Sequence, residues 1–156
     1  MGDADLTNDP MNIRDHTLAW RWTDRRYALF SEAVLAQMQP VEADEAARLC
    51  SRSLTFEGED GLAESVFSVT TAFVGGMSQE TGCRWLRELQ PDVSVEVAIS
   101  WDQSTAIRTT WEIFTAQWDD FCYPASDDAH VWPLSENWVL RYHHIEEFQF
   151  GRRRGA

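Results

Sequence analysis

The chain has 156 residues and a formal net charge of -13, with 26 acidic side chains against 13 basic ones, all of them arginines. This length suits one hydrophobic core, no stretch reaches the roughly 20 apolar residues of a membrane span, and no secretory signal opens the sequence, so we expect one domain in the cytoplasm, not attached to a membrane. The acidic surface should repel nucleic acid, and the absence of lysine excludes Schiff-base and P-loop chemistry.

The first predicted elements follow a polar, acidic segment. Residues 1–16 lack a periodic pattern, and we expect a flexible acidic arm there, ahead of a single domain over residues 17–151. Residues 20–22 are expected to begin a short strand. A helix should follow up to residue 39, because four apolar side chains recur at helical spacing before a proline: Tyr27, Phe30, Val34 and Met38.

Three more helices are expected before the middle of the chain ends. An alanine-rich apolar stripe predicts a helix over residues 43–54, and two glycines among acids predict a turn over residues 57–61. Residues 62–74 match both a helix and a strand, and we assign a helix there. Ser78 is the expected N-cap of the last of these helices, which should end before Pro91.

The period then changes from helical to extended. Alternation of apolar and polar residues over 93–101 predicts a strand, and residues 105–110 should form its hairpin partner. A capping box at Thr109 predicts a helix that ends at Tyr123.

Two short strands, over residues 138–142 and 146–150, are expected to form a second hairpin. The fold class is therefore α+β: N-terminal helices packed on a C-terminal antiparallel sheet of about four strands, with one helix inserted between two hairpins. Residues 152–156, which contain three successive arginines, are expected to form a basic tail.

Four segments of the chain carry a resemblance: Trp20 to Thr23, Leu35 to Pro40, Thr109 to Phe114 with Trp118, and Glu147 to Phe150. These segments resemble small bacterial proteins that are known only as domains of unknown function. The stretch from Trp101 to Gly151, with Trp118 to Pro124 at its centre, also resembles proteins from the immunity side of bacterial polymorphic toxin systems. The resemblance implies a bacterial cytoplasmic protein of the inhibitor type, and it carries over no catalytic residue.

The candidate nucleophiles and metal ligands form no established motif. The three cysteines fit neither a metal knuckle nor a disulfide framework, so we expect buried free thiols. His130, His143 and His144 lie near Cys122 in the sequence, but His143 and His144 would point to opposite faces if they lay in a strand, and would be exposed and merely polar at the tip of a tight hairpin, so we expect no metal site. Because glycine-rich phosphate loops and serine-nucleophile motifs are missing, we expect no cofactor and assign no catalytic residue.

The candidate partner-binding residues are two acidic pairs and a tryptophan: Asp119, Asp120, Asp127, Asp128 and Trp132. Trp132 is expected in a loop, where it either anchors a protein interface or closes the end of the sheet. We expect a non-catalytic acidic module of the immunity or inhibitor type that engages a basic protein partner. The alternative that stays open is a small hydrolase or metal-dependent enzyme built around Cys122 and the three histidines just named.

Overall fold

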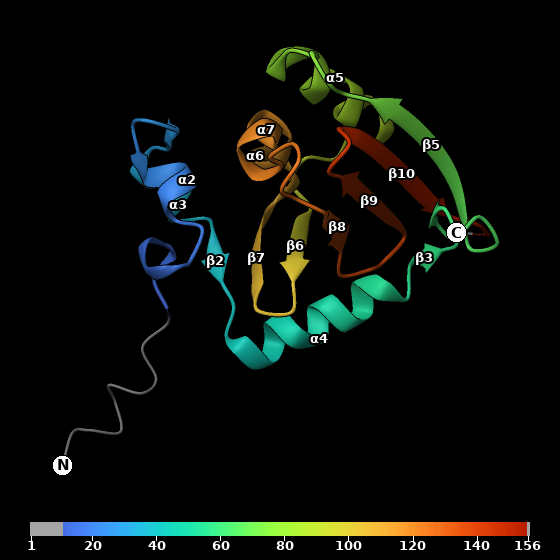
Figure 1. Cartoon of the computed structure of the whole chain (residues 1–156), viewed down its shortest axis with the longest axis horizontal. Coiled ribbons are helices and arrows are strands. Elements are labelled where there is room, and N and C mark those ends of the chain that lie inside the picture. The colour runs from blue at the N-terminus through green and yellow to red at the C-terminus, as the bar shows by residue number, and fades with distance from the viewer. Residues whose placement is uncertain (1–10, 156) are drawn as a thin grey trace.

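A seven-stranded antiparallel sheet forms the frame of the protein (Figure 1). The computed structural model describes residues 11–155. In spatial order the strands are β2 (Gln39–Pro40), β7 (Thr105–Thr110), β6 (Glu96–Asp102), β8 (Ala129–Pro133), β9 (Trp138–His143), β10 (Glu147–Arg153) and β5 (Phe67–Phe73). The other elements are η1 (Ile13–Asp15), α2 (Trp20–Thr23), β1 (Ala28–Leu29), α3 (Glu32–Leu35), α4 (Ala43–Leu54), the β3 (Glu57–Gly58) and β4 (Gly61–Leu62) hairpin, α5 (Gln79–Leu89), α6 (Trp111–Ala116) and α7 (Trp118–Phe121).

Helices cover both faces of this sheet (Figure 1). α4 lies along one face, where Leu49 packs against a small core that contains Ala98 and Trp132. α5, α6 and α7 cover the other face and enclose the larger core. Because side chains alternate along a strand, Val97 and Ile99 of β6 face the larger core while Ala98 faces the smaller one. The central strands are therefore buried on both faces.

Side-chain caps begin the two helices that pack against each other above the larger core. Ser78 accepts a hydrogen bond from the backbone N–H three residues later, at 3.1 Å, and starts α5 as predicted. Thr110 does the same for the N–H of Ile113 at 3.2 Å, so the cap of α6 lies one residue after the predicted Thr109. The single helix predicted to end at Tyr123 is divided at Gln117 into α6 and α7.

The α+β class is confirmed, but the predicted sheet is too small. α4 matches the predicted helix over 43–54, and β6 with β7 forms the predicted hairpin. The sheet has seven strands rather than about four. The helices also do not precede it as a block, because α5 lies between β5 and β6 in the chain and two short helices lie between β7 and β8.

Two predicted helices and one predicted strand are wrong. Residues 67–73, expected within a helix over 62–74, form β5, which pairs with β10 along its whole length. Residues 24–39 contain β1, the short α3 and the start of β2 instead of one helix, and residues 20–22 lie in α2 instead of a strand. In β5 and β2 pairing with distant strands outweighs the local spacing of apolar side chains.

Both ends of the described chain belong to the fold. Residues 1–10 of the expected arm lie outside the described residues, whereas Ile13, in η1, is buried in the larger core. Arg152 and Arg153 are the last residues of β10, and the Nε of Arg153 donates a hydrogen bond to the carbonyl of Glu136 at 2.9 Å. The fold thus extends past the boundaries expected at residues 16 and 151. Across residues 11–155, none of the helices has the length and apolar character of a membrane span.

Candidate functional site

A buried ion pair joins α2 to the loop that follows α7. The guanidinium of Arg21 donates two hydrogen bonds to the carboxylate of Asp127, at 2.6 and 3.0 Å, across 106 residues of sequence. The side chains are only 6% and 7% exposed. Asp127 also accepts the backbone N–H of Tyr123 at 2.8 Å. Asp127, predicted to bind a partner, is therefore not available at the surface: it holds the 123–127 loop against α2.

Trp20 and Tyr123 lie over the guanidinium of this ion pair and Tyr27 packs against Trp20; we call these three side chains the aromatic patch. The ring of Trp20 lies 4.7 Å from that of Tyr27 and 5.9 Å from that of Tyr123, between centroids. The guanidinium carbon of Arg21 lies 4.0 Å from the centroid of Tyr123, in cation–π geometry. Trp20 is 41% exposed and Tyr27 51% exposed. Large aromatic surface thus faces the solvent on a support that is itself buried.

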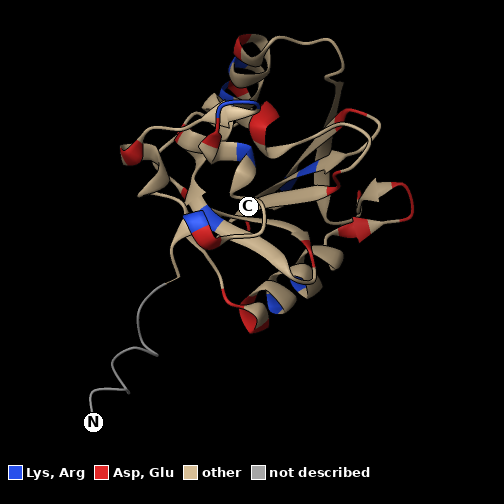
Figure 2. Cartoon of the chain, turned by 60° about the vertical axis from the view of Figure 1, so that its left-hand side comes forward, with Lys and Arg blue, Asp and Glu red and all other residues tan. Residues whose placement is uncertain are grey.

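Of the two predicted acids on α7, Asp120 lies close to Tyr123 of this patch, whereas Asp119 accepts a hydrogen bond from Nε2 of Gln79 at the start of α5. Asp119 is exposed, and Asp120 is half-buried. The indole N–H of Trp22 donates to the backbone carbonyl of Asp120 at 3.1 Å, which fixes α7 to α2. Burial, together with the charge of Asp119, raises the pKa of Asp120 to about 6. Figure 2 turns this side of the molecule forward and shows acidic residues spread over many elements rather than gathered in one place.

The raised pKa of Asp120 predicts a pH-dependent effect of its replacement. In the folded protein this carboxyl holds its proton up to about pH 6, whereas the unfolded chain loses it near the ordinary value of 3.8. Above about pH 6 the charged carboxylate of Asp120 therefore destabilises the fold. This destabilisation disappears as the pH falls from about 6 towards 3.8.

We expect Asp120→Asn to raise the thermal midpoint at about pH 7.5 and to lose that advantage at about pH 4. Asp60→Asn, which removes an exposed charge from the β3–β4 hairpin, is the matched control. An Asp120→Asn variant whose advantage is the same at both pH values would contradict the assignment.

Trp132 does not lie in a loop. It belongs to β8, is 4% exposed, and packs edge-on against Phe56 with ring centroids 5.3 Å apart. It faces the smaller core beneath α4, and is therefore not offered to a partner. The tryptophan that is exposed near α2 and α7 is instead Trp20, which was predicted to lie in a short strand and lies in α2.

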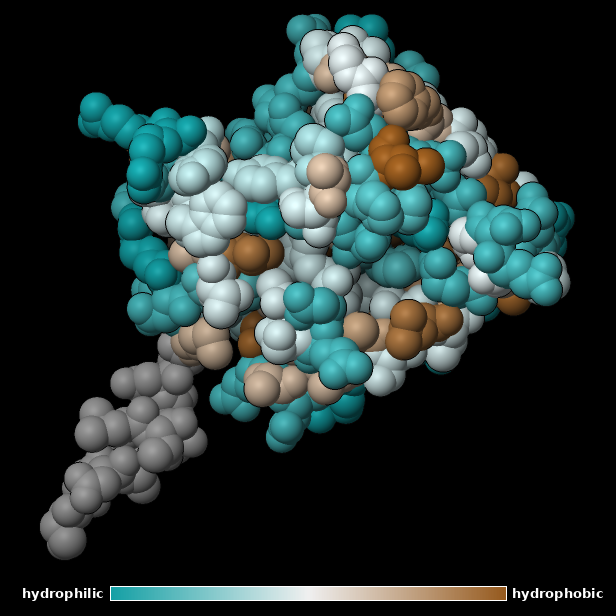
Figure 3. Space-filling model, in the orientation of Figure 1, coloured by the Kyte–Doolittle hydropathy of each residue, from teal (hydrophilic) through white to brown (hydrophobic). Residues whose placement is uncertain are grey.

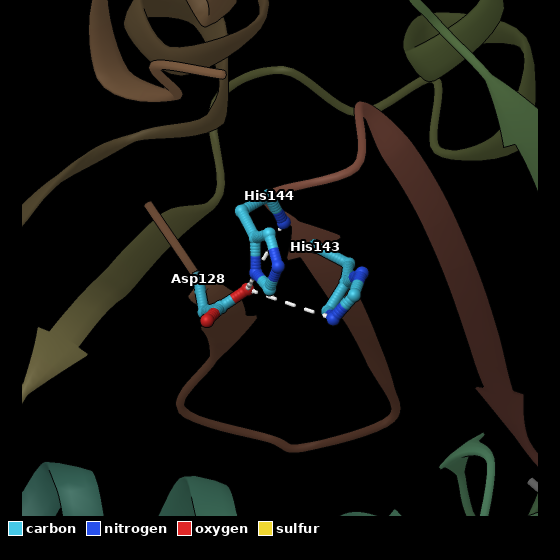
Figure 4. A group of neighbouring side chains, drawn as sticks. All are labelled: Asp128, His143 and His144. Atoms are coloured by element: carbon cyan, nitrogen blue, oxygen red, sulfur yellow. Dashed lines mark hydrogen bonds and ion pairs between the residues drawn. The ribbon is translucent and has the colours of Figure 1, made fainter. Parts of the chain in front are cut away.

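The other predicted acid, Asp128, lies beside two histidines (Figure 4). Its Oδ1 is 2.9 Å from Nδ1 of His144 and 4.0 Å from Nε2 of His143. The two imidazole rings have centroids 4.2 Å apart. The strand arrangement, with the two histidines on opposite faces, is wrong, and the hairpin arrangement is closer, because His143 ends β9 while His144 begins the turn to β10. The structure therefore brings Asp128, His143 and His144 together, outside the aromatic patch.

The constellation of Cys122 with three histidines, which was the alternative, is assembled only at His143 and His144. Cys122 is buried, and burial raises the pKa of its thiol well above the usual value, so it stays protonated. His130 lies on the opposite face of the sheet from Cys122, with its Nε2 2.7 Å from a carboxylate oxygen of Glu57, which also accepts Nε of Arg141. All three cysteines are free, and the other two are only partly buried.

Comparison of the chain with protein-family models, curated proteins and solved structures finds no match. A fold class alone does not determine what a protein does. The features that bear on function are therefore the aromatic patch, the acids of α7 and the cluster of Asp128, His143 and His144.

Proposed function

We propose that the protein is a non-catalytic binding module of the immunity or inhibitor type, whose aromatic patch, together with the acids of α7, engages a basic protein partner. The observation that carries this proposal is the exposure of Trp20 and Tyr27, 41% and 51%, on a buried ion-paired base. Tryptophan and tyrosine are enriched among the few residues that supply most of the binding energy of protein interfaces.

The base beneath the patch favours tight binding because it fixes the aromatic rings in advance. Arg21 is held by Asp127 and stacks on Tyr123, so α2 and the 123–127 loop form one rigid unit. Side chains that are ordered before binding lose less conformational entropy when a partner arrives. On the face shown in Figure 3 the strongly hydrophobic residues lie in separate spots and form no continuous apolar patch that would compete as a binding surface.

The charge of the chain favours a cationic partner. Eight arginines form ion pairs with acids of the same chain within residues 11–155: Arg14, Arg21, Arg26, Arg52, Arg84, Arg108, Arg141 and Arg153. The remaining field is mainly negative, with a formal net charge of -13. Such a field accelerates the approach of a basic protein from many directions, and the aromatic patch then gives the contact its specificity.

The test is co-expression, in a bacterial host, of the chain with the product of a gene adjacent to its own that inhibits growth. The unchanged chain should restore growth and bind the purified inhibitor of growth, and association should slow between about 50 mM and about 0.5 M salt. Restoration of growth without any physical complex would overturn the proposal.

Trp20→Ala should weaken this complex by at least about tenfold, since anchor tryptophans contribute about 2 kcal/mol or more. Leu134→Ala, at a side chain that is 90% exposed in the β8–β9 connection, is the control and should leave the affinity unchanged. Circular dichroism of both variants checks that the fold is retained. Equal affinities of the two variants would exclude the aromatic patch as the binding surface.

A further inference from the structure

We propose that Asp128, His143 and His144 form a binding site for one divalent transition-metal ion of the zinc type. The site goes beyond the proposed function and does not depend on it. Each residue offers one ligand atom, and these three atoms all lie within 4.8 Å of one another. They come from three segments that meet at one end of the sheet: the residue before β8, the end of β9 and the β9–β10 turn (Figure 4).

The backbone fixes the relative position of the ligands. The carboxylate of Asp128 accepts the backbone N–H of His144 at 3.0 Å, so the acid is joined to the turn independently of the His144 ring. The carbonyl of His144 accepts the N–H of Ala125 at 3.0 Å. Glu146, with a φ of 67°, turns the chain into β10 directly after the two histidines. These constraints place both imidazoles on the same side of the turn, next to Asp128.

The present distances suit tetrahedral coordination after small side-chain rotations. A tetrahedral Zn²⁺ with bonds of about 2.1 Å separates its ligand atoms by about 3.4 Å. The separations of 2.9 Å and 4.0 Å from the Asp128 oxygen to His144 and His143 lie on either side of that value. The metal would replace the hydrogen bond between the Asp128 carboxylate and Nδ1 of His144, and the bond to the backbone N–H of His144 could remain.

The donor set decides the class of metal. Two imidazoles with one carboxylate suit Zn²⁺, Cu²⁺, Ni²⁺ or Fe²⁺ better than Mg²⁺ or Ca²⁺, which prefer oxygen ligands throughout. The side chains are 28%, 45% and 58% exposed for His143, His144 and Asp128, so water has access to the further coordination positions. Partial burial opposes the ionisation of Asp128, but hydrogen bonds from His144 keep the pKa of Asp128 below its usual value, and the ligand is anionic at neutral pH.

Metal binding would also affect the loop that carries Tyr123 of the aromatic patch. The turn that carries His144 is bonded to Ala125, in the same loop as Tyr123 and Asp127. An ion that joins Asp128 to this turn ties both ends of that loop to the sheet. Bound zinc should therefore stabilise the folded state according to its concentration relative to the dissociation constant.

The experiment is a calorimetric titration of the tag-free, chelator-dialysed full chain with ZnCl₂. We expect one Zn²⁺ per chain, and an affinity at least about tenfold lower for Asp128→Asn and for His144→Ala. His130→Gln and Asp60→Asn are the matched controls, because they remove a histidine and an acid elsewhere and should bind zinc like the unchanged chain. Thermal midpoints measured without metal check that all four variants fold.

A second measurement protects the conclusion if one variant is destabilised. The visible absorption spectrum of the Co²⁺ complex reports the coordination geometry, and it should be altered by His143→Ala and unaltered by His130→Gln. The proposal is overturned if zinc binding does not saturate at one equivalent. It is also overturned if a double variant, Asp128→Asn with His144→Ala, binds zinc as tightly as the unchanged chain does.

Discussion

Replacement of Asp127 by alanine is expected to lower the free energy of unfolding by about 3 to 5 kcal/mol. The change leaves the guanidinium of Arg21, whose side chain is 6% exposed, without the carboxylate that neutralises it. The Nε of Arg21 already has no hydrogen-bond partner within residues 11–155. Loss of Asp127 would add two more unpaired donors, and the N–H of Tyr123 would lose its acceptor as well.

The measurement is urea unfolding at neutral pH, followed by tryptophan fluorescence. Arg84→Ala is the matched control, because it breaks an exposed ion pair with Glu80 on α5 and should change the stability by about 0.5 kcal/mol or less. A loss below about 1 kcal/mol in Asp127→Ala would mean that water reaches Arg21 and that the base of the aromatic patch is not rigid.

The sequence predicted β6 correctly, but for an incomplete reason. Alternation of apolar and polar residues indicates a strand with one buried face. In the fold Val97, Ala98, Ile99 and Ser100 are all buried, and the alternation is one of size. Large side chains face the larger core, and the small Ala98 and Ser100 fit beneath α4 on the other face. A strand with one buried face and a strand with two buried faces both give a period of two, which explains why the strand was predicted correctly.

β5 was not predictable in the same way, because its pattern is set by one distant partner. Phe67 is fully buried while Phe73, at the other end of the strand, is 67% exposed. A strand at the edge of the sheet has one neighbour, here β10, and its residues were compatible with helical spacing. Only the pairing of Phe67 with Arg153, 86 positions later in the chain, distinguishes the two.

The candidate site shows the same division between local and distant signals. Asp119 and Asp120 lie on a helix as predicted, but only Asp119 is exposed, while Asp120 is half-buried. Asp127 looks identical to them in sequence, but it is buried because Arg21 reaches it from the opposite end of the chain. Trp20 had no local feature that marks it as exposed. A tryptophan's exposure depends on what packs over it, and periodicity within α2, a four-residue helix, carries no such information.

The histidine pair depended on a strand end. The opposite-face rule holds within an extended strand and fails where the chain leaves it. β9 ends at His143, one residue later than predicted, so both histidines lie at or beyond the end of the strand and their rings come to lie side by side. Element ends are the least predictable feature of a sequence, and the convergence of Asp128 with the two histidines occurs at such an end.

Trp111→Ala is expected to cost about 3 to 5 kcal/mol of unfolding free energy, the usual range for the loss of a buried aromatic side chain. Trp111 is fully buried at the start of α6, and its ring lies 4.7 Å from that of Trp138 and 5.5 Å from that of Phe114. Its indole N–H donates to the carbonyl of Gln90 at 2.9 Å, which joins α6 to the end of α5. The truncation therefore opens a cavity between helices and sheet and leaves that carbonyl without its donor.

Trp111→Phe helps to separate these two contributions, because it keeps a buried aromatic ring but removes the donor together with the five-membered ring that carries it. We expect it to lose about 1 to 3 kcal/mol in the same urea experiment, clearly less than the alanine variant. Leu134→Ala, at an exposed position, should stay within about 0.5 kcal/mol. If the phenylalanine and alanine variants were equally unstable, the hydrogen bond to Gln90 rather than the packing of Trp111 against Trp138 would hold α6 on the sheet.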